Sequence, residues 1–346
     1  MKNNHNYSYN FYIIHLLSII FILMIGCNIY HTGNKSTISQ KSININQIKK
    51  DMSQLDLSNN YYPADSITKY FKYYDIKFEN NYHYFGNFKS GNEVIAAHIF
   101  IPYNPKGTIF LIHGYFDHSA TLKNLIKDCL KREFVVAIYD LPGHGLSTGE
   151  RASINDFSEY VAILENFIIA YNDYLPTPFH LIAHSTGCAI AYEYMNHTQN
   201  IIFKKVVFMA PLVHNAYWRL SILGYHLAKP FVKTIPRKNI KNSSDPLFLD
   251  FIKNDPLQNK KISINFLNAL YSWNKRIKNY NVLSKSVLII QGAADASVDW
   301  KYNISFFKVK ISDLKIEMIE NARHQLANES ALLRLKIFNY LFEYIE

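Results

Sequence analysis

The sequence predicts an α/β fold in which a mostly parallel central sheet is flanked by helices and a helical cap is inserted after strand 6. Short β-branched runs alternate with segments of helical periodicity, which is typical of parallel sheets. The alternation stops at about residue 212 and resumes after residue 280, which predicts the insertion. A Ser at one strand-to-helix junction indicates that the sheet carries a reactive site.

The composition favours one large globular domain. In 346 residues, 49% are hydrophobic and 18% are charged, which excludes extensive disorder. Only one long apolar run exists, so a multi-span membrane protein is excluded as well. The net charge of +10 is spread among Asn, Ile and Tyr, and we interpret it as a bias of composition. No basic block interleaved with aromatic residues points to nucleic acid, so no nucleic-acid partner is expected.

Residues 1–27 are predicted to be a signal peptide. Lys2 precedes an apolar stretch over residues 11–25, and residues 23–27 resemble a bacterial lipobox ending at Cys27. A lipobox implies that Cys27 is acylated, which predicts an exported lipoprotein anchored to a membrane at the periplasmic face or cell envelope. A signal peptide without lipid and an uncleaved anchor helix are the alternatives. The apolar run is shorter than the roughly 20 residues that a membrane span needs.

The next segment, residues 28–60, is rich in Asn, Ser, Lys and Gln and has no sustained apolar period. We therefore expect a flexible tether that connects the anchor to a folded domain over residues 61–346.

The elements of that domain follow from periodicity. Strands are expected over residues 93–102, 107–114, 134–140, 178–185 and 205–211. Helices are expected between the later strands, over residues 120–131, 154–174 and 186–196. After the cap at about 212–280, where no strand is expected, come a strand at 286–291, a helix at 300–309, a strand at 314–320 and a closing helix at 328–346.

Ser185 is the candidate nucleophile. It lies in Ala183-His184-Ser185-Thr186-Gly187, between an apolar run and a helical pattern, which is the context of a nucleophile elbow. Small flanking residues let the helix and the strand approach closely, and the strained turn projects the hydroxyl above the sheet. An alternative is that Ser185 only caps the helix that begins at Thr186.

A Ser nucleophile needs a base and an acid, and topology selects them. His324 follows the last expected strand and Asp295 follows the strand before it, so both emerge at the sheet edge that holds Ser185. His324 is expected to take the hydroxyl proton, while Asp295 orients the imidazole. Asp299 is the alternative acid, although it lies further into the next helix.

The tetrahedral intermediate requires two donors for its oxyanion. We expect the backbone N–H groups of Thr186 and of Tyr115, in the loop after the strand at residues 107–114, to supply them. Because both donors belong to the main chain, side-chain substitution at either position is expected to be mild. The remaining site histidines, His113, His144 and His184, are expected to be hydrogen-bonded neighbours.

Four ordered motifs resemble the monoglyceride lipase and lysophospholipase branch of the α/β-hydrolase fold, which is also grouped with serine aminopeptidase-like hydrolases. They are His113-Gly114 with His118-Ser119, residues 140–147 (DLPGHGLS), His184-Ser185-Thr186-Gly187, and Gly292-Ala293-Ala294-Asp295 with Val298-Asp299. The resemblance covers roughly residues 80–346. Ala183 and Phe116 depart from the family pattern, and Phe116 leaves the shape of the acyl pocket open.

The resemblance implies hydrolysis of a single-chain acyl ester, such as a lysophospholipid or monoacylglycerol, with no metal and no organic cofactor. Aromatic and aliphatic residues at helical spacing over 217–231 could line an acyl pocket, touch lipid or pack the cap onto the core. The rival activities are a short-chain carboxylesterase and an aminopeptidase-like hydrolase, and the rival class is a non-catalytic binding domain. The oligomeric state stays open.

Overall fold

The computed structural model describes residues 43–237 and 240–346. The predicted signal peptide, Cys27 and residues 28–42 of the predicted tether lie outside the described residues. Within the described ranges, no helix combines the length and the apolar character needed to cross a bilayer.

The core of the catalytic domain is an eight-stranded sheet in the order β1-β2-β4-β3-β5-β6-β9-β10. Its strands are β1 (Asn81–Ser90), β2 (Glu93–Pro102), β3 (Gly107–Ile112), β4 (Phe134–Tyr139), β5 (Phe179–His184), β6 (Phe203–Met209), β9 (Leu283–Gly292) and β10 (Ile311–Ile319). β2 is antiparallel to both β1 and β4, whereas the remaining neighbours are parallel. The strands β3, β4 and β5 are buried along their whole length because helices cover both faces of a parallel sheet.

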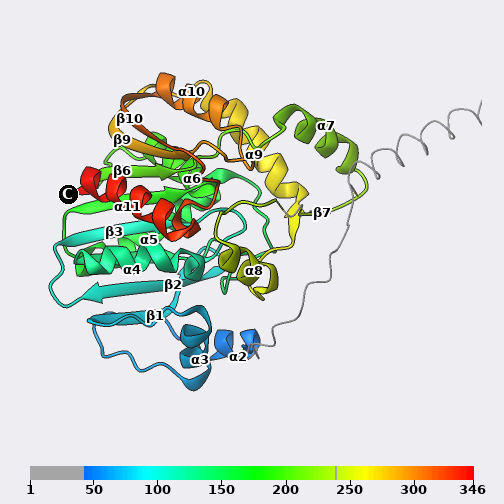
Figure 1. Cartoon of the computed structure of the whole chain (residues 1–346). Coiled ribbons are helices and arrows are strands. Elements are labelled where there is room, and N and C mark those ends of the chain that lie inside the picture. The colour runs from blue at the N-terminus through cyan, green and yellow to red at the C-terminus, as the bar shows by residue number, and fades with distance from the viewer. Residues whose placement is uncertain (1–42, 238–239) are drawn as a thin grey trace, which may run out of the picture. The chain divides into compact units, whose positions relative to one another are not determined.

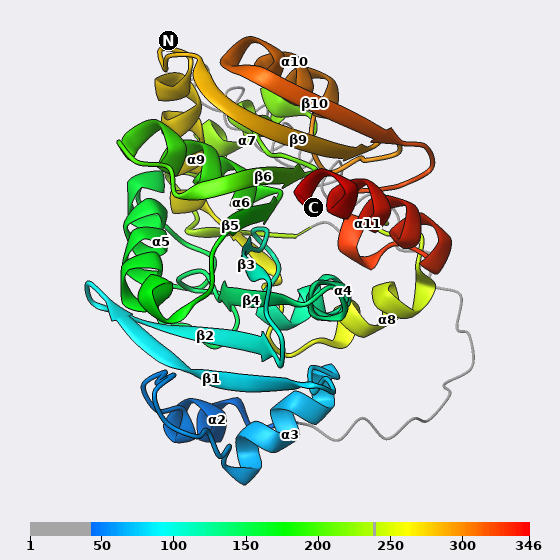
Figure 2. The same cartoon turned by 90° about the vertical axis from the view of Figure 1, so that its left-hand side faces the viewer.

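Two layers of helices cover the sheet (Figures 1 and 2). α4 (Lys123–Lys131) and α11 (Ala331–Ile345) contribute to the apolar cluster on one face. α5 (Phe157–Tyr171), α6 (Thr186–His197) and α10 (Trp300–Lys310) contribute to the cluster on the other. This topology confirms the predicted α/β fold class with its mostly parallel central sheet.

The interval between β6 and β9 holds the cap. Its elements are α7 (Trp218–Ala228), β7 (Thr234–Pro236), α8 (Pro246–Asn254), β8 (Lys261–Ser263) and α9 (Ile264–Ile277). β7 and β8 pair antiparallel, so the expectation of no strand before residue 286 is wrong. Each of these strands has only three residues, too few for an alternating pattern to be visible in the sequence.

The folded region begins before the predicted boundary at residue 61. Residues 43–60, expected to belong to the tether, include α2 (Ile45–Asp51), and Ile48, Met52 and Leu55 are buried. Leu55 N donates to Asn87 O and Asn87 N donates to Ser53 O, so this segment covers the outer edge of β1. The expectation is therefore wrong from residue 43 onward, because a seven-residue helix with one buried position carries no detectable period. α3 (Asp65–Tyr74) packs in the same cluster.

Candidate active site

Ser185 lies at the sharp turn between β5 and α6, as the sequence predicts. Its backbone has φ 54° and ψ −113°, a conformation that L residues rarely adopt. Ser185 N donates to Met209 O of the neighbouring strand β6, which holds the turn in place. Strain at this position indicates a functional constraint, and helix capping does not explain it because the Ser185 side chain makes no cap hydrogen bond to α6.

Close backbone approach explains the glycine after this turn. A Cβ on Gly187 would lie 2.5 Å from Ile112 O, so only glycine lets α6 pack this tightly against β3. On the opposite side of Ser185, a Cβ on Gly114 would lie 3.2 Å from the Ser185 Cβ. The loop after β3 therefore passes directly beside the candidate nucleophile.

The structure brings His324 and Asp295 to Ser185. His324 Nε2 lies 3.0 Å from Ser185 Oγ, and His324 Nδ1 lies 2.8 Å from Asp295 Oδ2. The three side chains come from the loops after β5, β9 and β10, which end at the same edge of the sheet. All three residues are buried, so water competes little with these hydrogen bonds.

The interaction between His324 and Asp295 favours the charged forms of both side chains. Burial alone lowers the pKa of His324, but the Asp295 carboxylate outweighs it and raises this pKa above the ordinary value, with Asp117 acting in the same direction. Burial raises the pKa of Asp295, whereas His324 and hydrogen bonds from Ser297 N and Gln291 lower it below its usual value overall. Asp295 is thus held as a carboxylate that can stabilise an imidazolium.

Asp299, the alternative acid, lies at the beginning of α10 and acts as its N-cap. Its carboxylate accepts a hydrogen bond from Tyr302 N and caps the beginning of α10. Asp295 is the carboxylate that contacts His324.

The two expected oxyanion donors belong to the residue after Ser185 and to the loop that passes beside Ser185. Thr186 N is at the first turn of α6, where the helix dipole favours negative charge. Tyr115 N follows Gly114, which approaches the Ser185 Cβ. Within the described part of the chain, neither of these N–H groups donates a hydrogen bond, so both are free to bind an oxyanion.

His113 orients one of these donors, a role that sequence reasoning missed. Its Nε2 accepts from Leu141 N, which leaves Nδ1 protonated to donate to Gly114 O at 2.8 Å. Asp117 N also donates to Gly114 O. Because a peptide unit is planar and trans, fixing this carbonyl directs the Tyr115 N–H to the opposite side.

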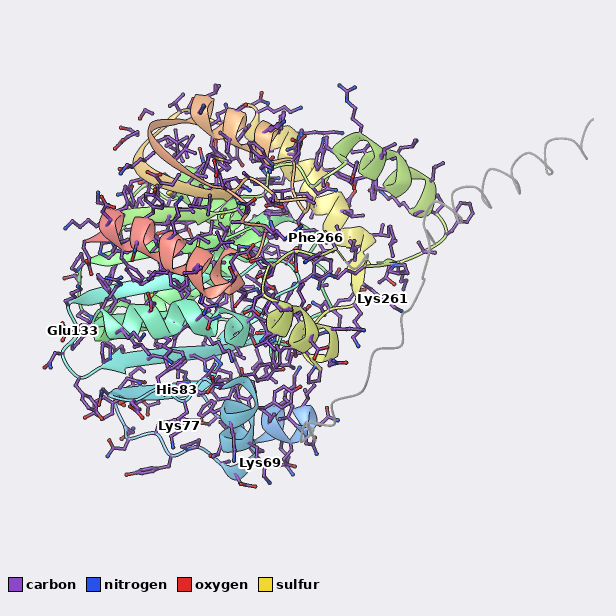
Figure 3. The ribbon with its side chains drawn as sticks, viewed as in Figure 1. Lys69, Lys77, His83, Glu133, Lys261 and Phe266 are labelled. Atoms are coloured by element: carbon purple, nitrogen blue, oxygen red, sulfur yellow. The ribbon has the colours of Figure 1, made fainter. Side chains whose placement is uncertain are left out.

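The Tyr115 side chain connects the core to the cap. Its ring stacks on Phe266 of α9 with centroids 3.7 Å apart, and its hydroxyl accepts from Ser263 N and donates to Ala152 O (Phe266 is labelled in Figure 3). The Tyr115 side chain is therefore part of the cap interface, so its substitution is expected to affect stability even though the main-chain N–H is retained.

Asp117 joins the loops that surround Ser185 and was not singled out in the sequence. It accepts from Gln325 Nε2 at 3.0 and 3.1 Å, and its Oδ2 lies 3.2 Å from His184 Nδ1. His184 Nε2 in turn lies 3.0 Å from His324 O. His184 is therefore a hydrogen-bonded neighbour, as predicted, within a network that holds the His324 loop.

A second buried set of hydrogen-bonded side chains joins the cap to the rest of the domain. His118 Nε2 lies 2.9 Å from Asp255 Oδ2, and Tyr74 Oη donates to Asp255 Oδ1 at 2.6 Å. Asp255 follows α8 in the cap, whereas His118 belongs to the loop after β3 and Tyr74 ends α3. No signal in the sequence could have joined these three distant positions.

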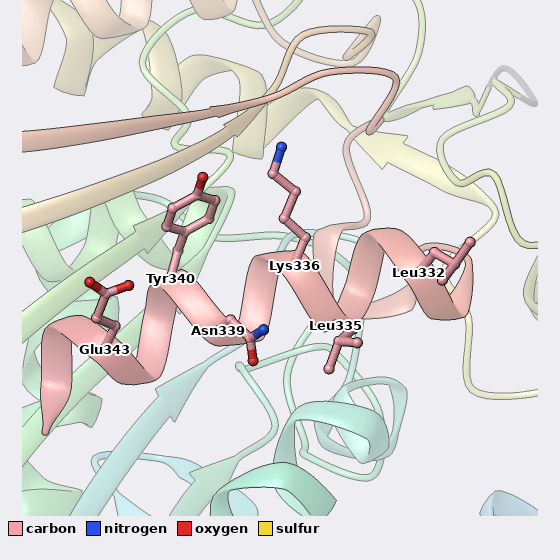
Figure 4. Close-up of a pocket in the computed structure, with 6 residues that line it drawn as sticks. All are labelled: Leu332, Leu335, Lys336, Asn339, Tyr340 and Glu343. Atoms are coloured by element: carbon pink, nitrogen blue, oxygen red, sulfur yellow. The ribbon is translucent and has the colours of Figure 1, made fainter.

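Two surface hollows lie elsewhere on the protein. One runs along the outer side of α11, and another lies between the loop that precedes β1 and α4. Figure 4 shows that the first is formed by side chains of one helix, which are Leu332, Leu335, Lys336, Asn339, Tyr340 and Glu343. Neither hollow contains Ser185 or His324. Among the described residues, no cluster of three or more His, Cys, Asp or Glu is placed to hold a metal ion.

A hydroxyl, an imidazole and a carboxylate aligned at the carboxyl edge of this sheet define a serine hydrolase of the α/β-hydrolase class. Within that class, the chain belongs to the serine aminopeptidase S33 family, whose model matches residues 103–331. This agrees with the family resemblance found in the motifs.

Known proteins similar in sequence include several named monoglyceride lipase and one named phospholipase. The monoglyceride lipase of Homo sapiens is 26% identical over 247 residues, covering 68% of this chain and 80% of that protein. A monoglyceride lipase homolog of Monkeypox virus is 27% identical over 235 residues, covering 65% and 84%. A phospholipase of Bacillus subtilis is 26% identical over 239 residues, covering 65% and 90%.

Solved structures share the fold. A soluble variant of the monoglyceride lipase from Saccharomyces cerevisiae, in complex with a substrate analog, superposes with a TM-score of 0.67 at 18% identity. The alignment covers 78% of this chain and 96% of that one.

Proposed function

We propose that the protein hydrolyses acyl esters of single-chain lipids, such as lysophospholipids or monoacylglycerols, through an acyl-Ser185 intermediate. The observation that carries the proposal is the continuous contact from Ser185 Oγ through the His324 imidazole to the Asp295 carboxylate, with spacings of 3.0 and 2.8 Å. Relatives named monoglyceride lipase and phospholipase support the lipid ester as the substrate class.

The proposed reaction has two halves. His324 Nε2 accepts the hydroxyl proton as Ser185 Oγ attacks the ester carbonyl, and the N–H groups of Tyr115 and Thr186 bind the oxyanion. The imidazolium then protonates the leaving alcohol, which departs and leaves the acyl group on Ser185. Water attacks this acyl-enzyme with His324 again as the base, and the fatty acid is released as Oγ regains its proton.

The exposed face of α7 supports a substrate at a lipid surface. Several large apolar residues at helical spacing point to solvent and do not pack onto the core. They are Tyr217, Leu220, Leu223, Leu227 and Phe231. An apolar stripe of this kind beside Arg219 and Lys229 suits contact with an anionic lipid surface.

The decisive experiment combines a variant with a substrate panel. Ser185→Ala should abolish ester turnover and labelling by a fluorophosphonate probe, while its thermal unfolding matches that of the native protein. Lysophospholipids, monoacylglycerols, p-nitrophenyl esters of increasing chain length and aminoacyl p-nitroanilides then compare the candidate substrates. Rates that fall steadily from the shortest ester, or preferential cleavage of the anilides, would reject the lipid assignment.

We further propose that the protein is an exported lipoprotein held at a membrane by acylated Cys27. Support comes from the apolar run after Lys2 and the lipobox-like residues 23–27. Metabolic labelling with palmitate should mark the native chain and not Cys27→Ala. Cys129→Ala is the matched control, since Cys129 is a buried free thiol. Labelling that survives in Cys27→Ala would contradict the anchor.

A further inference from the structure

The positive charge of this chain is concentrated in the cap. Residues 212–280 contain twelve Lys or Arg and three Asp, a net charge of +9, whereas the whole chain has +10. The cap thus has four basic residues for each acidic one, although its Lys are still interspersed among uncharged residues. Four of these basic residues lie within or directly beside the paired strands β7 and β8: Lys233, Arg237, Lys260 and Lys261 (Lys261 is labelled in Figure 3).

Arg237 differs from these exposed lysines because it is partly buried and its guanidinium is held in place. The guanidinium lies over the ring of Phe116, 4.0 Å from the ring centroid. Its Nη1 donates to Gln258 Oε1 at 2.7 Å, and its backbone N donates to Lys260 O. The chain thus positions one cap arginine against the loop that follows β3.

The donors of this arginine are mostly unused. Among the described residues, no carboxylate lies within ion-pair distance of the guanidinium, and Nη1 to Gln258 is its one side-chain hydrogen bond. Burial lowers the pKa of Arg237 and the charge of Asp117 raises it, but no described carboxylate touches the guanidinium. Its unused N–H groups therefore favour the binding of an anion.

Gln258 adds a second unused donor. It is 7% exposed, and its Nε2 has no hydrogen-bond partner among the described residues. The orientation of the amide is settled chemically, because Arg237 can only donate and therefore requires Oε1 to face it. The amide NH₂ and the free guanidinium N–H groups together form a set of donors without an acceptor, which suits the oxygens of an anion.

This donor set lies beside the reacting groups. The Arg237 guanidinium lies over the ring of Phe116. Phe116 directly follows Tyr115, whose N–H is a proposed oxyanion donor. The charge of Arg237 also acts on His324. Burial lowers the pKa of His324, Asp295 raises it, and Arg237 acts in the same direction as burial. Arg237 is thus close enough to the reacting groups for its charge to act on His324.

We propose that Arg237 and Gln258 bind the phosphate of a glycerophospholipid ester whose acyl carbonyl lies at Ser185, which makes lysophospholipids the preferred substrate over monoacylglycerols. This inference rests on the function proposed above. In a lysophospholipid, the phosphate is carried on the same glycerol as the scissile ester, and a planar guanidinium matches two phosphate oxygens. A monoacylglycerol has a neutral hydroxyl in that place and leaves the arginine unpaired.

The test measures kcat/KM for 1-oleoyl lysophosphatidylcholine and for 1-oleoylglycerol in the same neutral detergent micelles, using the full chain. Both substrates carry the same acyl chain, and the zwitterionic headgroup has no net charge, so general attraction to the basic cap is minimised. Any change in His324 affects both reactions and cancels in the ratio of the two kcat/KM values. Arg237→Gln should lower this ratio about tenfold or more.

Two further variants make the outcome decisive. Gln258→Glu keeps Arg237 packed on Phe116 but gives it a carboxylate partner that competes with the phosphate, so the ratio should fall in this variant also. This variant tests the site even if Arg237→Gln does not fold. Lys260→Gln, an exposed change directly before β8, should leave the ratio unchanged. An unchanged ratio in folded Arg237→Gln or in Gln258→Glu overturns the phosphate site while lipid hydrolysis stands. A native protein that cleaves neither lipid rejects the proposed function, and the phosphate site with it.

Discussion

His118 Nε2 and Asp255 Oδ2 lie 2.9 Å apart, and both side chains are fully buried. The pair joins the cap to the loop that carries Tyr115, so the stability of the cap and the shape of the candidate site depend on the same contact. Removing one partner of a buried ion pair leaves the other charge without compensation.

Asp255→Asn is expected to lower the free energy of unfolding by about 3 kcal/mol, measured by urea denaturation. Asp250→Asn is the matched control, because Asp250 is exposed in the helix that precedes Asp255, and it should change stability little. Equal stability of the two variants would show that the buried pair contributes nothing.

The cost of Asp255→Asn should also depend on pH. Burial lowers the pKa of His118, but the Asp255 carboxylate raises it above the ordinary value overall. Because the pKa of His118 is higher in the folded than in the unfolded protein, its protonation stabilises the fold. This contribution is fully present below the unfolded pKa of about 6.5 and is lost as the pH rises through the folded pKa. The pKa of Asp255 is lowered, so its own contribution is present above the unfolded pKa of about 4. The difference between native and variant should therefore be largest between about pH 4 and 6.5 and shrink at higher pH.

Catalysis should require neutral His324, whose pKa is raised above the ordinary 6.5 by Asp295 against the opposing effect of burial. The acid limb of a kcat/KM profile with an uncharged ester is therefore expected to have its midpoint above pH 6.5. Arg237→Gln should move this midpoint upward, since the Arg237 charge lowers the same pKa. A midpoint below 6.5, or a downward movement in the variant, would be inconsistent with these electrostatics.

Gly187→Ala should destabilise the fold by about 1–3 kcal/mol and reduce activity, because the added Cβ would lie 2.5 Å from Ile112 O and push α6 from β3. Gly224→Ala is the paired control in the cap helix α7, where a Cβ meets nothing within 4 Å. That substitution should stabilise the protein by about 0.5–1 kcal/mol through helix propensity. Melting temperatures that move in the same direction for both variants would contradict this account.

Tyr115→Phe should cost about 1–3 kcal/mol of stability, because it keeps the ring on Phe266 but leaves the buried Ser263 N without its acceptor. Turnover should fall less than in Ser185→Ala, since the Tyr115 main-chain N–H is retained. Thermal unfolding together with ester hydrolysis separates the two effects. A stability equal to that of the native protein would mean that water replaces the lost hydroxyl.

Much of the fold was predictable because its signals are local. The strand-helix alternation predicted β2 to β6 and the helices between them, since buried parallel strands are apolar along their whole length. Elements without such a signal were missed: α2 buries only Ile48, and β7 and β8 have three residues each. In these elements, tertiary contacts and not intrinsic periodicity decide the conformation.

For the candidate site, the sequence by itself determined the residue types and their order: Ser185 at a strand-to-helix turn, then Asp295, then His324, each after a strand of a parallel sheet. Chain topology alone brings such positions to one edge. Only the tertiary structure decided which acid contacts His324, how His113 directs the Tyr115 N–H, and that Arg237 lies over Phe116 beside a free amide of Gln258. These relationships join residues far apart in the chain, and their energies depend on burial and on hydrogen-bond geometry, neither of which leaves a periodic trace in the sequence.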